Sequence, residues 1–383
     1  MKQSEMGEMY SNSEVSGSPF KGRRGRIIIA GGGTGGHIFP AIAIANALKK
    51  MDNNIGILFV GAKGKMEMEK VPKAGYSIKG LDIAGFNRSS LIKNIGLPFK
   101  LVKSFFQVRS IFKEFHPDAV IGVGGYSSFP VLRYAQATGV PTFIHESNSF
   151  AGKSNIMLGK KATKVFVAAD EMEKFFPKEK IVFTGNPVRS VITSSVITRA
   201  EGLKFFSLNE NKRTVLVVGG SLGAKSINEA IDKDLDLLLN EDLQLIWQTG
   251  KPYVTKAKQR TEGKKDVWVN EFITEMEYAY AAADIVIARS GAMTVAELCV
   301  AGKPVLFVPY PFAAEDHQTV NAKKLVNKNA ALMITNSEAL NKLVPELIAL
   351  AKDENRQTEL KNNIKKLAVT NADKKIAEEI LMV

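Results

Sequence analysis

Residues 26–50, RIIIAGGGTGGHIFPAIAIANALKK, place a β-branched run, a glycine-rich turn and an apolar segment next to one another. Arg26–Ala30 is typical of a buried strand, and Pro40–Lys49 has the composition of a helix. Strand, glycine turn and helix in this order predict the opening unit of a parallel α/β sheet.

The same pattern recurs along the chain. Further strands are expected at Ala119–Val123, Thr142–Ile144, Thr214–Val218, Ala283–Ala288 and Val305–Val308. A second turn of the opening type, at residues 219–224, precedes a helix expected over residues 225–239. One sheet needs only one such start, so the sequence predicts the α/β class with two doubly wound parallel-sheet domains of similar size. We expect the join near residues 185–208, where the pattern lapses.

Composition narrows the range of functions. The chain has 383 residues, of which 45% are apolar and 24% are charged, an ordinary globular balance that excludes a fibrous protein. Its one cysteine, Cys299, excludes a disulfide framework. A net charge of +13 favours an anionic partner: a nucleotide, a nucleic acid or a membrane surface. We expect no nucleic-acid partner, because the sequence contains no recognised DNA- or RNA-binding module.

Residues 1–25 are polar and lack the apolar core of a signal peptide. We expect them to be a disordered leader, or to reflect an upstream start codon, and to lie outside the fold. No apolar run approaches the roughly 20 residues that span a bilayer. A single cysteine and no export signal indicate the cytoplasm.

The glycine turns and histidines are the candidate chemistry. Such turns suit phosphates, because backbone N–H groups and a helix N-terminus can approach the anion closely. Neither turn matches a Walker A motif, and NAD binding is weakly supported. His37 follows the first turn, where it could accept a proton from a hydroxyl or pack in the loop. His145 and Glu146 follow a strand, where they could meet a ligand or form a surface pair; no spacing suggests a metal, and no cofactor is expected.

Seven strings stand in the order found in one family. They are GGGTGGHIFPAIAIA (31–45), GVGGYSSFP (122–130), HESNSFAGKSN (145–155), TGNPVR (184–189), GGSLGA (219–224), RSGAMTVAEL (289–298) and DHQTVNA (316–322). Together they resemble the MurG family of peptidoglycan N-acetylglucosaminyltransferases, from about Arg26 to the C-terminus. That family moves N-acetylglucosamine (GlcNAc) from UDP-GlcNAc to the lipid acceptor undecaprenyl-pyrophosphoryl-MurNAc-pentapeptide.

The resemblance implies a GT-B fold, with two Rossmann-like domains facing a cleft, and inversion at the anomeric carbon without a metal. Residues 26–190 would form the acceptor- and membrane-binding domain, joined by a last helix over about 368–383. Residues 191–367 would bind UDP-GlcNAc. The enzyme would act as a peripheral protein at the cytoplasmic face of the bacterial inner membrane, with a cell-wall synthesis complex as a further candidate partner.

The resemblance also implies a set of donor-binding residues. Arg189 would neutralise a diphosphate, and Glu297 would accept hydrogen bonds from the ribose hydroxyls. The full set is Thr34, Gly35, Gly36 and Asn148; Arg189 and Ser221; Phe272 and Ile273 beside the uracil; Ala292, Met293, Thr294, Val295, Ala296 and Glu297; and Gln318 and Asn321 beside the GlcNAc hydroxyls.

An acceptor set follows from the same resemblance. The first glycine turn would cradle the lipid pyrophosphate, and His37 is the candidate base that activates the MurNAc 4-hydroxyl. The remaining acceptor residues are Gly32, Gly33, Tyr126, His145 and Glu146, and the last three are the alternative bases.

Two positions depart from the family pattern. Leu222 replaces a glutamine that many relatives carry after the serine of the second turn, which removes a side-chain contact to phosphate. Residues 311–315 form a longer segment than in some relatives, which leaves the contacts of residues 313–315 open.

Residues 86–115 predict a membrane contact. Six basic side chains are interleaved with leucines and phenylalanines there, against one acidic side chain, Glu114. The basic residues are Arg88, Lys93, Lys100, Lys103, Arg109 and Lys113. At helical spacing this pattern indicates a segment at an anionic membrane surface, or a helix whose apolar face packs on the sheet.

Three other functions account for part of the sequence. The first is a glycosyltransferase acting on another lipid, such as a diacylglycerol, and the strings at 124–130 and 145–152 argue against it. The second is a UDP-sugar-binding scaffold without turnover, which need not keep both half-sites. The third is a nicotinamide dehydrogenase, which cofactor absorbance would expose.

Overall fold

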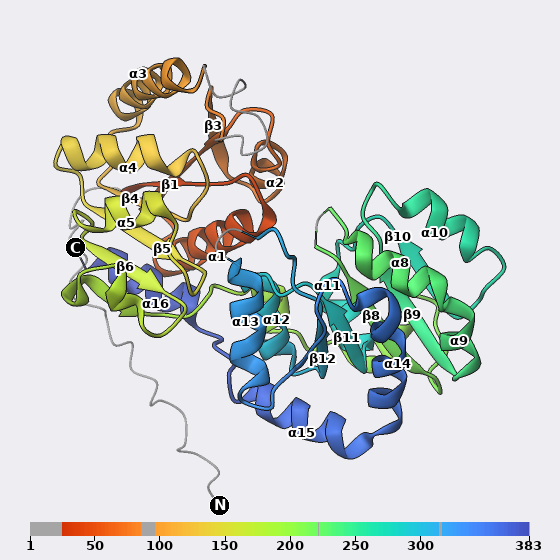
Figure 1. Ribbon diagram of the computed structural model, residues 1–383. Helices are drawn as coiled ribbons and strands as arrows, with labels where there is room; N and C mark the ends of the chain where they lie inside the picture. Colours follow the sequence, from red (N-terminus) through yellow and green to blue (C-terminus); the bar gives the residue numbers. More distant parts are fainter. Residues whose placement is uncertain (1–24, 86–95, 221, 314–315, 383) are drawn as a thin grey trace, which may run out of the picture.

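The computed structural model describes residues 25–85, 96–220, 222–313 and 316–382. They form two α/β domains, each built on one parallel sheet flanked by helices (Figure 1). The predicted fold, two Rossmann-like domains, is therefore confirmed. The leader expected to be disordered lies outside the described residues, apart from Gly25.

The first domain has a seven-stranded sheet in the order β3-β2-β1-β4-β5-β6-β7. Its strands are β1 (Arg26–Ala30), β2 (Gly56–Ala62), β3 (Ser77–Leu81), β4 (Ala119–Gly122), β5 (Thr142–Glu146), β6 (Lys164–Val167) and β7 (Ile181–Phe183). Its helices are α1 (Gly35–Met51), α2 (Glu67–Lys73), α3 (Leu97–Phe115), α4 (Ser128–Ala137) and α5 (Lys153–Gly159), with 3₁₀ turns η2 (Met172–Lys174) and η3 (Lys178–Lys180).

The second domain repeats this topology with six strands in the order β10-β9-β8-β11-β12-β13. The strands are β8 (Arg213–Val218), β9 (Leu243–Gln248), β10 (Val267–Asn270), β11 (Ile285–Ala288), β12 (Val305–Phe307) and β13 (Leu332–Met333). The helices from the connection onward are α6 (Ser190–Thr193), α7 (Arg199–Phe205), α8 (Lys225–Lys233), α9 (Leu235–Asn240), α10 (Val254–Arg260), α11 (Met276–Ala282), α12 (Ala292–Ala301), α13 (His317–Val326), α14 (Ala339–Lys352), α15 (Glu354–Lys365) and α16 (Ala372–Leu381).

The β-branched runs form strands because both faces of each sheet are covered. Ile27 and Ile29 pack on one side of β1, and Ile28 packs on the other; all three are fully buried. Successive side chains of a strand point to opposite faces, so a strand inside two helix layers must be apolar at consecutive positions. The same alternation separates Val217 from Val218 in β8.

Several boundaries differ from the sequence prediction, and three of the differences have a clear structural reason or place a site residue. Helix α1 begins at Gly35 rather than Pro40, because His37 and Ile38 already donate their N–H groups to the carbonyl of Thr34. Strand β5 continues through Glu146. The helix expected over residues 225–239 is interrupted at Asp234, and the break lets the apolar sides of both α8 and α9 reach the core.

The C-terminal helix α16 packs on α1 of the first domain, although it follows the second domain in sequence (Figure 1). Ile376 and Ile380 are buried in the same cluster as Ile44 and Leu48 of α1. An ion pair between Lys164 of β6 and Glu379 also ties the helix to this domain. The chain therefore crosses between the domains a second time.

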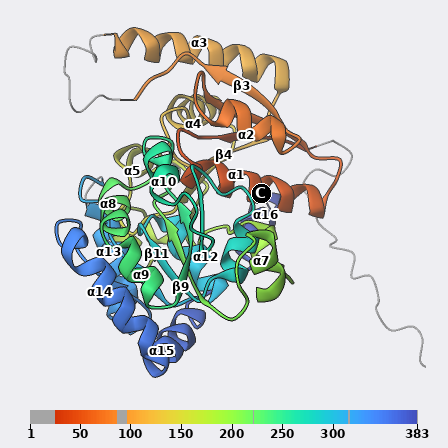
Figure 2. The ribbon, with the colours of Figure 1, turned by 90° about the vertical axis from the view of Figure 1, so that its right-hand side faces the viewer.

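Helix α3 lies on the outer side of the first domain in both views (Figures 1 and 2). Its inner side contributes Val108, Ile111 and Phe112 to the core. Its outer side exposes Phe99, Val102 and Phe106. Within the part of the chain that the structure describes, no helix has both the length and the apolar character needed to cross a membrane.

Candidate functional site

The two domains meet at the carboxyl ends of their sheets, where open α/β folds bind ligands. Asn186, in the connection, donates from Nδ2 to the carbonyls of Ser147 (3.1 Å) after β5 and Ala292 (3.5 Å) at the start of α12. Ser149 donates to Oδ1 of Asn321 on α13 (3.3 Å). These contacts bring the predicted acceptor and donor segments to one junction.

The first glycine turn is held from within the protein. The N–H groups of residues 31–33 donate, in order, to Val60 O (3.1 Å), Gly124 O (3.2 Å) and the carboxylate of Glu67 (2.8 Å). The N–H groups of residues 34–36 come next, at the start of α1, where a helix has no internal acceptors for them. An anion at this turn would therefore meet residues 34–36 rather than the expected Gly32 and Gly33 N–H groups.

His37 directs one ring nitrogen to the carbonyl of Gly32 and the other toward Gly124. Its Nδ1 lies 3.0 Å from the carbonyl oxygen of Gly32, so Nδ1 carries the proton and Nε2 is the acceptor in the neutral ring. Nε2 lies over Gly124, where an added Cβ would approach it to 2.7 Å. Burial lowers the pKa of His37, against the opposing effects of the Gly32 carbonyl, Glu146 and Glu67. The imidazole is thus neutral at neutral pH, with Nε2 as its acceptor nitrogen.

The predicted donor residues Arg189 and Glu297 contact each other. Arg189 Nε donates to Glu297 Oε1 at 3.0 Å, and the hydroxyl of Tyr280 donates to Oε2 at 3.0 Å. Glu297 is buried on α12, whose N-terminus carries residues 292–294. The Arg189 guanidinium also lies 4.9 Å above the ring of Phe39 on α1. The expected ribose acceptor is therefore pre-oriented by two donors.

Comparisons with known proteins agree with this arrangement. The model of the glycosyltransferase family 28 N-terminal domain matches residues 27–167, and the model of the family 28 C-terminal domain matches residues 214–380. The chain is 50% identical to a Parabacteroides distasonis protein, with 94% of this chain and 99% of that one covered. That relative is named UDP-N-acetylglucosamine–N-acetylmuramyl-(pentapeptide) pyrophosphoryl-undecaprenol N-acetylglucosamine transferase. The chain belongs to the MurG family.

Two further relatives extend the comparison. A Flavobacterium psychrophilum protein with the same name is 49% identical, with 93% of this chain and 97% of that protein covered. The crystal structure of Acinetobacter baumannii MurG superposes with a TM-score of 0.74 at 30% identity, covering 94% of this chain and all of that one.

The alternative bases are less available than His37. His145 is buried in β5, with Nε2 3.4 Å from the Gly185 carbonyl, and burial lowers its pKa to about 4. The Glu146 carboxylate is also buried and accepts from Asn148 (3.1 and 3.4 Å), Gly152 N (3.1 Å) and Asn155 (2.8 Å). Glu146 thus shapes the loop after β5.

Tyr126, the third alternative base, is half exposed beside the first turn. Its ring lies directly on Gly85, where an added Cβ would overlap it. The hydroxyl-bearing end of the ring therefore rests on the Gly85 backbone, while about half of the residue's surface stays exposed (51%). This position suits contact with a bound molecule better than proton abstraction.

The second glycine turn is clamped by Gln248 at the end of β9, a residue the sequence analysis missed. Its side chain accepts from Gly219 N (3.2 Å) and donates to the carbonyls of Gly220 (3.0 Å) and Glu271 (2.9 Å). Leu222 is 81% exposed. The predicted phosphate contact Ser221 lies outside the described residues.

Of four further predicted donor residues, two are buried and two are partly buried. Ile273 is buried in the core. Nζ of Lys70 on α2 lies 5.6 Å from the centroid of the Phe272 ring. Asn321 is buried and donates to Ser290 O (3.1 Å), so its amide already holds the loop after β11. Gln318 accepts from Tyr310 N (3.0 Å).

Four polar residues at the junction were not predicted: Glu67, Asn186, Gln248 and Tyr280. Oδ1 of Asn186 is buried and has no hydrogen-bond partner among the described residues. Gln248 was detectable in principle, since a polar side chain ends an apolar strand in LQLIWQ. Glu67 lies in a charged run that is typical of an exposed surface, and Tyr280 lies in an apolar helix that is typical of a core, so neither was predicted as a site residue.

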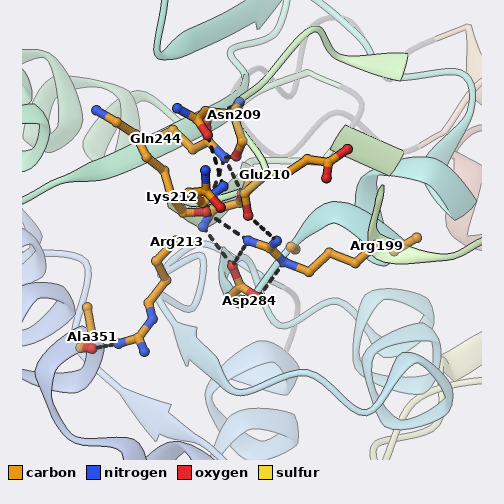
Figure 3. A network of polar contacts seen from close by, with 12 residues as sticks. Arg199, Asn209, Glu210, Lys212, Arg213, Gln244, Asp284 and Ala351 are labelled. Carbon is orange, nitrogen blue, oxygen red and sulfur yellow. Dashed lines mark hydrogen bonds and ion pairs between the residues drawn. The ribbon is translucent and has the colours of Figure 1, made fainter. Parts of the chain in front are cut away.

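A separate cavity of about 620 Å³ lies at the opposite, amino-terminal edge of the second sheet. Among its lining residues, Arg199 pairs with Asp284 (2.9 Å) and donates to the carbonyl of Lys212 (2.7 Å) (Figure 3). Gln244 donates to the hydroxyl of Thr214 (2.9 Å). These contacts tie the starts of β8, β9 and β11 together.

Proposed function

We propose that this protein transfers GlcNAc from UDP-GlcNAc to the 4-hydroxyl of MurNAc in undecaprenyl-pyrophosphoryl-MurNAc-pentapeptide. The observation that carries the proposal is the position of His37, a neutral histidine at the junction with the donor segments, whose Nε2 has no hydrogen-bond partner among the described residues. Relatives about 50% identical over nearly the whole chain bear the name of this activity, which supports the choice of substrates.

The reaction needs one base and a stabilised leaving group. The MurNAc 4-hydroxyl gives its proton to Nε2 of His37 while its oxygen bonds to C1 of GlcNAc. The bond from C1 to the UDP oxygen breaks, UDP leaves with the bonding electrons, and the configuration at C1 inverts. The N-terminus of α12 and the terminal NH₂ groups of the Arg189 guanidinium would stabilise the charge that develops on the diphosphate.

The second domain is the proposed donor site. The diphosphate would lie between the turn at residues 219–224 and the start of α12, and the ribose hydroxyls would reach Glu297. Tyr280 and Arg189 already orient this carboxylate, so little reorganisation is required on binding. Within the described residues no group of three or more His, Cys, Asp and Glu side chains could hold a metal ion. The transfer assay below contains EDTA and so tests whether the reaction needs a metal.

The first domain is the proposed acceptor and membrane side. The acceptor pyrophosphate would meet the N–H groups of residues 34–36. Phe99, Val102 and Phe106 form an exposed apolar row on α3, at spacings that place them on one side of the helix. Lys100, Lys103, Arg109 and Lys113 flank that row, whereas Arg88 and Lys93 lie outside the described residues. This surface suits an anionic bilayer, and we place the enzyme at the cytoplasmic face of the inner membrane.

A transfer assay tests the proposal. Radiolabelled UDP-GlcNAc is mixed with the enzyme, EDTA and one of two acceptors: a short-chain lipid-linked MurNAc-pentapeptide or a diacylglycerol. Label should enter the lipid fraction only with the MurNAc acceptor. Transfer to the diacylglycerol alone would overturn the acceptor, and tight UDP-GlcNAc binding without transfer to either would support a scaffold instead.

A further inference from the structure

Glu67, the first residue of α2, lies beneath the first glycine turn. It is only 1% exposed. One carboxylate oxygen accepts from Gly33 N at 2.8 Å and the other from Ala62 N at 2.9 Å. A Cβ at Gly32 or at Gly61 would overlap the Glu67 side chain, so the two glycines form the space in which this acid fits.

A buried carboxylate is an unexpected support for a turn that is to face a pyrophosphate. In the second domain the equivalent turn is held by Gln248, a neutral amide. A negative charge under the first turn disfavours a phosphate directly above Gly32 and Gly33, because two anions would then lie close together in a partly desolvated place. Phosphate binding therefore does not explain why a buried carboxylate, that of Glu67, lies under this turn.

That explanation lies in His37. Glu67 fixes Gly33, and the carbonyl of the preceding residue, Gly32, accepts the Nδ1 proton of His37 at 3.0 Å. A histidine whose Nδ1–H is held by a carbonyl has its tautomer and its ring orientation set by that bond. Gly124 on the other side leaves room for Nε2.

We propose that Glu67 is a positioning residue: through Gly33 and Gly32 it holds His37 as the Nδ1–H tautomer with Nε2 free for the acceptor hydroxyl. The inference rests on the proposed function only where it assigns Nε2 of His37 the role of accepting the proton of the acceptor hydroxyl. The tautomer itself is a property of the unliganded protein and can be measured without turnover.

The charged groups around His37 give a second consequence. Glu146 and Glu67 raise its pKa, whereas burial, the largest effect, and His317 lower it. His145 also lies within electrostatic range. Removing the Glu67 charge should therefore move the pKa of His37 further down, which makes Nε2 a weaker base.

The first test is histidine NMR on the full-length protein. The chain has four histidines, so ¹⁵N-labelled imidazoles give few signals, and His37→Gln assigns the one in question. Wild type should show protonated Nδ1 and unprotonated Nε2 at pH 8. Glu67→Gln, whose side chain offers one acceptor oxygen to two donors, should show a mixed tautomer and a titration midpoint shifted to lower pH.

The matched control is Glu69→Gln, which removes a carboxylate two residues away on the same helix. Glu69 is exposed and pairs with Lys73 (2.7 Å). The Glu69→Gln variant should leave the NMR signals of His37 unchanged. An unchanged tautomer and midpoint in Glu67→Gln, with a folded protein by thermal melting, would overturn the proposal.

Kinetics supply a readout that separates positioning from folding. Glu67→Gln should lower kcat roughly 10- to 100-fold, as misplacement of a catalytic group does, with the Kd for UDP unchanged. The acid limb of its pH–rate profile should move to lower pH. A loss confined to UDP affinity, or an unchanged kcat, would contradict the proposal. An inactive wild type with the predicted NMR result would instead count against the proposed function alone.

Discussion

Arg189 Nε donates to Glu297 Oε1 at 3.0 Å, although the two residues are 108 positions apart in the chain. Arg189 lies in the connection between the domains, and Glu297 lies on α12. Both residues are expected to contact UDP-GlcNAc, one at the diphosphate and one at the ribose. Their ion pair therefore couples the two ends of the donor site before the nucleotide binds.

Arg189→Ala should weaken UDP binding by about 1.5–3 kcal/mol, a roughly 10- to 150-fold higher Kd, because a charge-assisted contact is lost and Glu297 loses one of its donors. Isothermal titration with UDP measures this. Arg356→Ala, which removes an arginine paired with Glu359 away from the junction, is the control and should bind UDP normally. Equal affinity of the Arg189 variant and wild type would exclude Arg189 from the donor site.

Tyr280→Phe removes the other donor to Glu297. One carboxylate oxygen of Glu297, a residue that is 7% exposed, would lose its partner, so the free energy of unfolding should fall by about 1–3 kcal/mol. Urea unfolding with and without UDP checks this, and bound UDP should restore part of the loss. Tyr278→Phe is the matched control, since that ring stacks on Phe205 and no hydrogen bond of its hydroxyl is seen among the described residues. A similar loss in both variants would assign the effect to packing.

The fold was more predictable than the site. The β-branched runs at Arg26–Ala30 and Arg213–Val218 could be recognised as strands from the local sequence alone. A strand covered by helices on both faces needs apolar residues at consecutive positions, and such a run is visible without knowledge of the rest of the fold. The break at Asp234 was missed, because tertiary burial of α8 and α9 decides it rather than local propensity.

The site was predictable only in part. His37 and the glycine turns belong to contiguous motifs and could be read directly. The contacts of Glu67, Tyr280 and Arg189 join segments far apart in the chain, so no local pattern reports them. Asn321, which is expected to meet a sugar, also donates to Ser290 O, and this contact 31 positions away is not evident from the local sequence.

His145 should make stability depend on pH. Its pKa is about 4 in the folded protein, because of burial, against an ordinary value of 6.5. The unfolded chain takes up this proton as the pH falls below 6.5 and the folded chain does not until about pH 4, so stability is lost over that window. At pH 5 the loss relative to pH 8 is about 2 kcal/mol.

Urea unfolding at pH 8 and pH 5 measures this contribution. His145→Gln should reduce the difference between the two pH values by about 2 kcal/mol. His116→Asn is the control, because His116 is exposed and has a positive φ that asparagine also adopts. A His145 variant with the full wild-type pH dependence would show that this histidine does not titrate as described.

The exposed row on α3 should govern membrane binding. The double variant Phe99→Ser and Phe106→Ser should bind vesicles of anionic phospholipid more weakly, because two large apolar side chains no longer enter the interface. Co-sedimentation measures the bound fraction. Val196→Ser, which changes a side chain that is 90% exposed on the connecting segment, should have no effect. Unchanged sedimentation of the double variant would place the membrane contact elsewhere.

Transfer of label by wild type and His37→Ala, run side by side with the lipid-linked MurNAc acceptor, tests the central claim most directly. Wild type should transfer GlcNAc, and the variant should lose about 10²- to 10⁴-fold in kcat while its Kd for UDP stays the same. A variant that transfers at the wild-type rate would contradict the assignment of His37 as the base, and absence of transfer by folded, UDP-binding wild type would contradict the proposed reaction.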